Sequence, residues 1–163
     1  MQDMLVRLYD LPPPLAPTNV TLRRGLAPEK HVVLDWVSNH FSAAWRSEVD
    51  VTFARQPVSC FLAIEDDTLL GFACYDAIAK AFFGPTGVSE RARGRGLGTA
   101  LLLACLHDMH CQGYAYAIIG GVGPVEFYQK TVGATLIEGS SPGIYRGLLR
   151  TLPRTTSSER DTE

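Results

Sequence analysis

The stretch around residues 82–119 most constrains how this chain can fold. Residues 97–112 (LGTALLLACLHDMHCQ) are rich in strong helix formers and end before Gly113, a residue type that often follows the last turn of a helix. An apolar strand-like run leads to Val88, and another occupies residues 114–120. A strand, a helix of about 16 residues and a second strand in this order predict a right-handed parallel βαβ crossover.

The flanking segments favour antiparallel strands and amphipathic helices. Residues 58–64 and 69–80 border the turn residues 65–68 and predict a β-hairpin, followed by a strand over 81–88. Apolar residues at helical spacing predict two helices between Pro28 and Pro57. Short strands are expected at 19–23, 134–137 and 144–149, and a short helix at 125–131. The predicted fold class is α/β (α+β), a mixed, mostly antiparallel sheet of about six to seven strands flanked by about four helices.

The length and the ends of the chain predict one domain. A chain of 163 residues with 46% hydrophobic side chains suits a single core. Residues 1–18 contain the run LPPPLAP, which favours extended polyproline conformation and predicts a Pro-rich N-terminal arm. Residues 153–163 are polar and charged, which predicts a disordered tail. The domain itself is therefore expected over residues 19–152.

The composition argues against several classes of partner. A formal net charge of −2 gives no global attraction to nucleic acid or to an anionic membrane. No apolar run reaches the roughly 18 residues of a membrane span, so a cytoplasmic protein is expected. The four cysteines form no C-x-x-C pair, and no metal is expected. His107, His110 and Cys111 have helical spacing that could suit a metal, but the polar edge of an amphipathic helix explains them better, and the sequence shows no fourth ligand.

A loop rich in glycine and arginine separates the strand from the long helix. Gly94, Gly96 and Gly98 let the backbone approach a ligand, and the first amides of the helix lack intrahelical partners. Three arginines at positions 91, 93 and 95 add positive charge, so the loop predicts a pocket for a pyrophosphate-like anion. A Walker loop would need a lysine after the glycines, and a Rossmann fingerprint would need a small residue at Thr99; neither is present.

Two motifs resemble those of a known family. Arg93-Gly94-Arg95-Gly96-Leu97-Gly98 resembles the signature [QR]-x-x-G-x-[GA] of the GNAT superfamily of acyl-CoA-dependent N-acyltransferases. Phe127-Tyr128, followed by Gly133-Ala134, resembles the motif on the last helix of that family. The order of strand, loop, long helix, strand and second motif also agrees. The resemblance covers residues 69 to about 149 and implies the GNAT-like version of the predicted sheet.

The resemblance implies where acetyl-CoA and the reacting groups lie. The pyrophosphate would lie on the loop amides, the pantetheine arm beside the preceding strand, and the Val88 N–H would face the developing oxyanion. Tyr128 would contact the co-substrate and donate a proton to the leaving thiolate. The implied acetyl-CoA contacts are Gly87, Val88, Arg93, Gly94, Arg95, Gly96, Leu97, Gly98, Thr99 and Tyr128.

The general base is not given by the resemblance. Many relatives carry a glutamate on the strand before the loop, but residues 82–88 contain no carboxylate. Glu48 and Asp50, near Trp45, are the candidates, although a solvated helix face also explains them. Gly121 and Pro124 stand where relatives have Asn and Ala, which puts the usual side-chain contact to the pantetheine in doubt.

The sequence therefore predicts an enzyme, an N-acetyltransferase that moves an acetyl group from acetyl-CoA to a primary amine in a ternary complex. A small-molecule acceptor is favoured. The alternatives are a protein or peptide N-acetyltransferase, which needs an open groove, and a non-catalytic CoA-binding regulatory domain. By analogy with the family, a homodimer is also compatible with the sequence.

Overall fold

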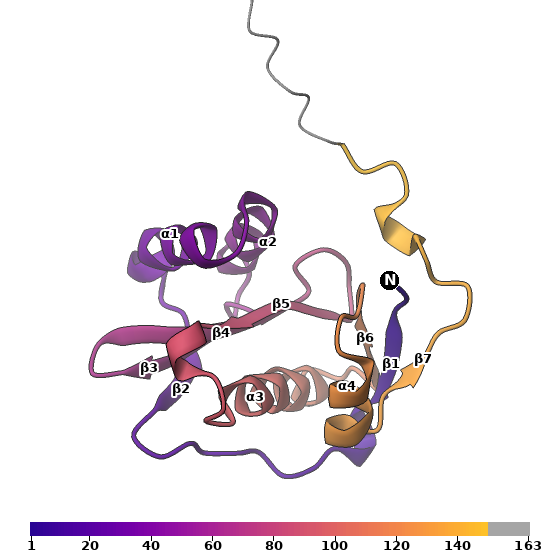
Figure 1. Cartoon of the computed structure of the whole chain (residues 1–163), viewed down its shortest axis with the longest axis horizontal. Helices are drawn as coiled ribbons and strands as arrows, with labels where there is room; N and C mark the ends of the chain where they lie inside the picture. Colours follow the sequence, from indigo (N-terminus) through magenta and orange to yellow (C-terminus); the bar gives the residue numbers. More distant parts are fainter. Residues whose placement is uncertain (150–163) are drawn as a thin grey trace, which may run out of the picture.

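The computed structural model describes residues 1–149, which form a seven-stranded sheet with helices on both faces (Figure 1). The strand order is β2-β3-β4-β5-β6-β1-β7, and every neighbouring pair is antiparallel except β5 and β6. The predicted mixed, mostly antiparallel sheet with one parallel pair is confirmed. The strands are β1 (Met4–Arg7), β2 (Thr21–Arg24), β3 (Cys60–Glu65), β4 (Thr68–Tyr75), β5 (Phe82–Val88), β6 (Tyr116–Ile119) and β7 (Thr135–Leu136). The helices are α1 (Lys30–His40), α2 (Ala43–Phe53), α3 (Leu97–Cys111) and α4 (Val125–Val132).

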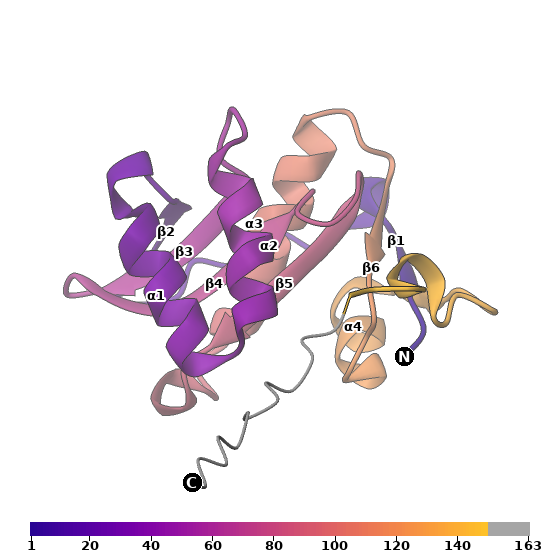
Figure 2. The same cartoon turned by 90° about the horizontal axis from the view of Figure 1, so that it is seen from above.

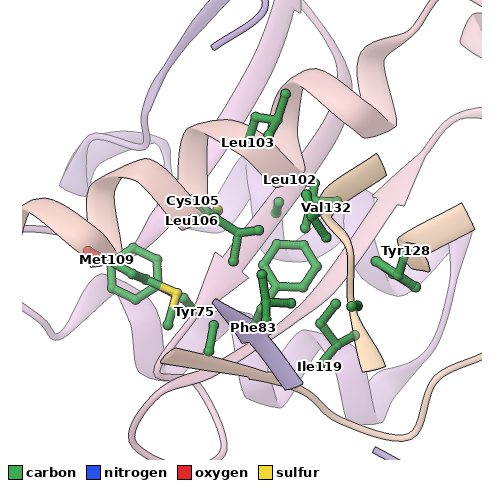
Figure 3. Close-up of a cluster of buried hydrophobic side chains, with 14 of the residues drawn as sticks. Tyr75, Phe83, Leu102, Leu103, Cys105, Leu106, Met109, Ile119, Tyr128 and Val132 are labelled. Atoms are coloured by element: carbon green, nitrogen blue, oxygen red, sulfur yellow. The ribbon is translucent and has the colours of Figure 1, made fainter. Parts of the chain in front are cut away.

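Two apolar clusters fix the helices on opposite faces of the sheet. α1 and α2 cover one face and α3 covers the other, with α4 beside β6 (Figures 1 and 2). On the α3 face, Leu102, Leu106 and Met109 join a buried cluster with Tyr75 and Phe83 (Figure 3). The side chains of strands β3 and β4 alternate between the two clusters, as the period of two along a strand requires.

The first residues lie inside the sheet. Residues 1–18 were expected to form an arm, but β1 pairs with β6 on one side and with β7 on the other. Met4 and Val6 are fully buried, whereas Arg7 is exposed, so one face of this strand joins the core. The proline run follows β1, and the Pro12 carbonyl contacts His107 Nε2 at 2.7 Å. The expected tail at 153–163 lies outside the described residues.

The second expected closing strand is absent from the described residues. The strand expected at 134–137 is present as β7, but the prediction of a strand beginning at residue 144 is wrong, because Gly143–Tyr145 forms a 3-10 turn. β1 already occupies the place between β6 and β7, so the sheet offers no interior position to that segment.

β5 is distorted where it leaves β6. Across from β4, Thr86 faces Ala73 while Phe83 faces Tyr75, so β5 carries one extra residue at Gly84–Pro85. Gly84 has φ +118°, a conformation that L side chains rarely adopt. Pairing with β6 is confined to Phe82 and Phe83. The remainder of β5 therefore has a backbone edge that is not paired with β6.

Candidate active site

The N-terminus of α3 presents free backbone amides beside a cavity. Gly96 precedes the helix with φ +75°, and no side chain caps it. The Ala100 N–H donates to the Gly96 carbonyl at 3.0 Å, so the three amides before it have no intrahelical partner. A Cβ atom at Gly98 would meet no atom within 4 Å. These groups line a cavity of about 260 Å³, here called the loop cavity, together with Val88, Arg93 and Phe127.

The two arginines expected to bind the anion differ in their surroundings. Arg93 lines the loop cavity and forms no salt bridge within residues 1–149. Arg95 instead donates to Glu65, with 2.5 Å between its Nη2 and Oε1 of the carboxylate. This hydrogen bond holds the pKa of Glu65 below its usual value. The structure thus leaves Arg93 free for an anion and directs Arg95 to the β3–β4 hairpin.

The free edge of β5 carries backbone donors. The Ser89 N–H donates to the Leu70 carbonyl at 2.8 Å, and hydrogen-bonded and non-hydrogen-bonded pairs alternate along an antiparallel ladder. Val88 and Thr86 are therefore non-hydrogen-bonded residues of this pair, and their N–H groups point away from β4. Sequence analysis singled out Val88 but missed Thr86, because only the register with β4 assigns the direction. Gly87 lies under the Phe41 ring, which is 2.3 Å from the position of a Cβ atom.

A second cavity, of about 400 Å³, opens where β5 and β6 part. Gly84 and Pro85 of β5 and Gly120 and Gly121 after β6 form one side. α2 contributes Trp45 and Glu48, and the C-terminal turn contributes Tyr145. We call this cavity the Glu48 pocket.

Of the two carboxylates considered as a base, Glu48 reaches the second cavity. The N-terminus of α2 is fixed by the Trp45 N–H donating to Ser42 Oγ at 3.1 Å, which sets the helix face toward β5. Burial raises the pKa of Glu48. Asp50 forms an ion pair with Lys30 at 2.5 Å and does not line the pocket.

Residues near the two ends of the described chain complete the Glu48 pocket, and sequence analysis missed them. The Tyr145 hydroxyl lies 2.9 Å from the position of a Cβ atom at Gly120, so a larger residue there would displace the Tyr145 side chain. Burial raises the pKa of Tyr145, and the charges of Glu48 and Asp3 raise it further. Asp3 is buried and accepts a hydrogen bond from the Gly121 N–H at 2.9 Å. No local sequence pattern connects residues so far apart in the chain.

Tyr128 lies beside the site and lines neither cavity. Its side chain is 7% exposed, packs in the core of the α3 face and has a pKa raised by burial (Figure 3). Its hydroxyl forms no hydrogen bond within the described part of the chain. Its neighbour Phe127, with ring centroids 4.9 Å apart, does line the loop cavity. α4 therefore reaches the loop cavity through Phe127.

Residues 1–149 contain neither a metal-binding cluster nor a membrane-spanning helix. No group of three or more His, Cys, Asp and Glu side chains is placed to hold a metal ion within this range. No helix of the described chain has the length and apolar character needed to cross a membrane.

Comparison with known families decides the affiliation. The model of the acetyltransferase (GNAT) family matches residues 30–134, which include the loop cavity, all of β5 and α4. The chain belongs to this family. A search among curated proteins found no match.

Solved structures share the fold. A GCN5-related N-acetyltransferase from Sphaerobacter thermophilus is 22% identical, with a TM-score of 0.62 over 83% of this chain and 48% of that one. A fungal glucosamine N-acetyltransferase region within a multi-domain β-N-acetylglucosaminidase is 14% identical, with a TM-score of 0.66 over 83% and 19%. A tandem GNAT protein from the clavulanic acid biosynthesis pathway is 22% identical, with a TM-score of 0.55 over 83% and 49%. The present chain thus spans about half or less of each of these longer chains.

Proposed function

We propose that this chain transfers the acetyl group of acetyl-CoA to the amine of a small molecule. The observation that carries the proposal is that the loop cavity and the Glu48 pocket lie at the two ends of one unpaired strand edge. Val88 lines the first cavity, and Gly84 and Pro85 line the second. An extended backbone from Gly84 to Val88 spans about 13 Å. A linear arm with a diphosphate at one end and a thioester at the other fits such an edge.

The loop cavity has the donors that a diphosphate needs. The free amides of Leu97, Gly98 and Thr99 point out of a helix N-terminus, where the macrodipole contributes roughly half a positive charge. Arg93 adds a full charge and is not neutralised by a carboxylate within residues 1–149. The open space at Gly98 allows phosphate oxygens to approach these amides. The residues present therefore fit the diphosphate of acetyl-CoA.

Glu48 is the proposed base. An alkylammonium has a pKa of about 10.4, so forming the neutral amine at pH 7.4 costs roughly 4 kcal/mol. A carboxylate with a raised pKa, at the edge of the pocket, accepts the amine proton directly or through a water molecule. Acetyl-CoA supplies the activated acyl group that the amine nitrogen attacks.

The remaining groups act on the charge that moves to oxygen and sulfur. When the C–N bond forms, the Thr86 N–H, which lies nearer the Glu48 pocket, donates to the thioester oxygen, which carries the negative charge, and the Val88 N–H is left to hold the arm near the loop cavity. When the C–S bond breaks, Tyr128 donates a proton to the sulfur, the role implied by its position in the family motif. A phenol with a pKa raised by burial is a weak acid, so hydrogen bonding to the developing thiolate contributes more than full proton transfer.

The shape of the Glu48 pocket favours a small acceptor over a polypeptide. Ser141, Pro142 and Tyr145 line the pocket together with Trp45 and Glu48 of α2, so two separate segments of the chain bound it. Its volume of about 400 Å³ lies in the range of small-molecule sites. A protein acceptor would need an open groove for the chain on either side of its lysine or N-terminus.

The first experiment is thermal unfolding with acetyl-CoA, with ATP and NADH as controls. At 100 times its dissociation constant, a specific ligand adds about 2.7 kcal/mol, which raises the midpoint of a domain of this size by roughly 5 to 10 °C. A rise with acetyl-CoA alone, followed by thiol release on adding an amine, supports the proposal. An unchanged midpoint at saturating acetyl-CoA contradicts it, and binding without transfer to any amine favours a regulatory domain.

A further inference from the structure

The charge distribution around the Glu48 pocket selects among amines, once the proposed function is granted. Glu48 is the only charged side chain of the described residues that lines the pocket. It forms no hydrogen bond or salt bridge within residues 1–149. The neighbouring acids of this helical region are paired: Asp50 with Lys30 at 2.5 Å and Asp35 with Arg46 at 3.7 Å. A ligand ammonium would supply the counter-charge that the protein does not provide to Glu48.

A second carboxylate reinforces this charge from behind the pocket wall. Asp3 is 7% exposed and is fixed by the Gly121 N–H, and its charge acts on the same Tyr145 hydroxyl as that of Glu48. The positive charge nearby is the terminal ammonium of Met1, which donates to Ser141 Oγ at 3.5 Å. Two carboxylates against one exposed ammonium leave the pocket negative. A cation is attracted to it, whereas a second anion is repelled.

The other walls of the pocket are apolar. The rings of Trp45 and Phe83 and the side chains of Ile78 and Pro85 contribute hydrocarbon surface. Trp45 stacks on the Phe41 ring, with centroids 5.0 Å apart. Within the described chain no arginine or lysine lines the pocket, so a carboxylate or a phosphate of the acceptor would meet only the exposed Met1 ammonium, which already donates to Ser141. A second ammonium would also lack a partner, since Asp3 lies behind the wall.

We propose that the acceptor is a primary monoamine with an apolar or aromatic body and no carboxylate, phosphate or second ammonium. Its nitrogen lies between Glu48 and the thioester at the end of β5, and its body packs against Trp45, Phe83 and Pro85. Glu48 thereby selects the amine as well as accepting its proton.

Matched pairs of amines test this inference, with CoA release as the assay. Phenethylamine and phenylalanine differ by one carboxylate, and hexylamine and 1,6-diaminohexane differ by one ammonium. We expect kcat/KM for phenethylamine to exceed that for phenylalanine by about 100-fold, and hexylamine to exceed the diamine by about tenfold, because the extra charge has no partner in the pocket. Equal or better use of either doubly functional amine overturns the inference.

Two variants separate the role of Glu48 from a general charge effect. Glu48→Gln should lower kcat/KM for phenethylamine by about 100-fold and reduce the discrimination against phenylalanine. Asp50→Asn removes the same charge from the same helix, away from the pocket, and should leave both unchanged. Acetyl-CoA affinity, measured by calorimetry, should be equal in all three proteins. Loss of acetyl-CoA binding in the wild type defeats the proposed function, whereas normal binding without transfer to any amine of the series defeats only the inference.

Discussion

Replacing Gly98 by alanine should separate stability from co-substrate binding. Gly98 is the second residue of α3, has no positive φ, and a Cβ atom there would meet nothing within 4 Å. Alanine therefore fits the protein without strain. Because alanine is about 0.8–1 kcal/mol more favourable than glycine inside a helix, the free energy of unfolding should rise by up to about 1 kcal/mol. The melting midpoint should increase by about 2–4 °C.

A side chain larger than the alanine that the family signature accepts at this position, as in Gly98→Val, should weaken acetyl-CoA binding. Gly98 lines the loop cavity, so the two methyl groups of valine take the space through which a phosphate oxygen would approach the amides. Loss of one charge-assisted hydrogen bond costs about 1.5–3 kcal/mol. The dissociation constant for acetyl-CoA should therefore rise by roughly 10- to 100-fold.

Calorimetric titration and urea unfolding of the same samples measure both effects. The matched control is Gly113→Ala, beyond the other end of α3, where φ is +96° and a Cβ atom also meets nothing. This variant should lose about 1 kcal/mol of stability, because alanine resists the left-handed conformation, and keep its affinity for acetyl-CoA. If Gly98→Val binds acetyl-CoA as tightly as the wild type, the α3 amides do not hold the diphosphate.

Four further results are expected. Tyr128→Phe should lower kcat by about ten- to a thousandfold with acetyl-CoA affinity retained, and unchanged kcat would remove Tyr128 from the mechanism. Because burial raises the pKa of Glu48, the pH–rate profile should lose activity as pH falls through a value above that of an ordinary glutamate, and Glu48→Gln should abolish that limb. Arg93→Ala should weaken acetyl-CoA binding in calorimetry by about tenfold and Arg95→Ala much less, since Arg95 is paired with Glu65; equal losses would place both at the anion. Met4→Ala should lower the free energy of unfolding by about 2–5 kcal/mol in urea titrations, and a loss below about 1 kcal/mol would show that β1 adds little to the core.

Local patterns predicted the elements that local contacts hold together. Helix propensity accounts for α3, the turn residues account for the β3–β4 hairpin, and Gly84–Pro85 accounts for the distortion of β5. β1 was not predicted, because four residues before a proline run carry little pattern and their partners lie more than a hundred positions away. The strand expected from residue 144 was also wrong. The position between β6 and β7 is occupied by β1, a segment from the other end of the chain.

The loop cavity could be predicted from the sequence, whereas most of the Glu48 pocket could not. The loop cavity is built from consecutive residues, so the motif around Gly96 located it, but only the fold showed that Glu65 engages Arg95. Glu48 was the expected base, with Asp50 as a neighbouring candidate, and the side of α2 on which each lies separates them. Tyr145 lines the pocket and Asp3 lies behind its wall because the two ends of the described chain meet there, which no single-sequence pattern encodes.

The interior position of β1 has a consequence for the order in which this chain is completed. Its pairing partners, β6 and β7, are synthesised more than a hundred residues after it. At about 5–20 residues per second, Met4 and Val6 leave the ribosome several seconds before those strands exist. Closing so large a loop is slow, because the chain loses its entropy before the contacts form. Since Asp3 directly precedes β1, the wall behind the Glu48 pocket forms only in chains extended through β7, so β1 is made long before it reaches its native position.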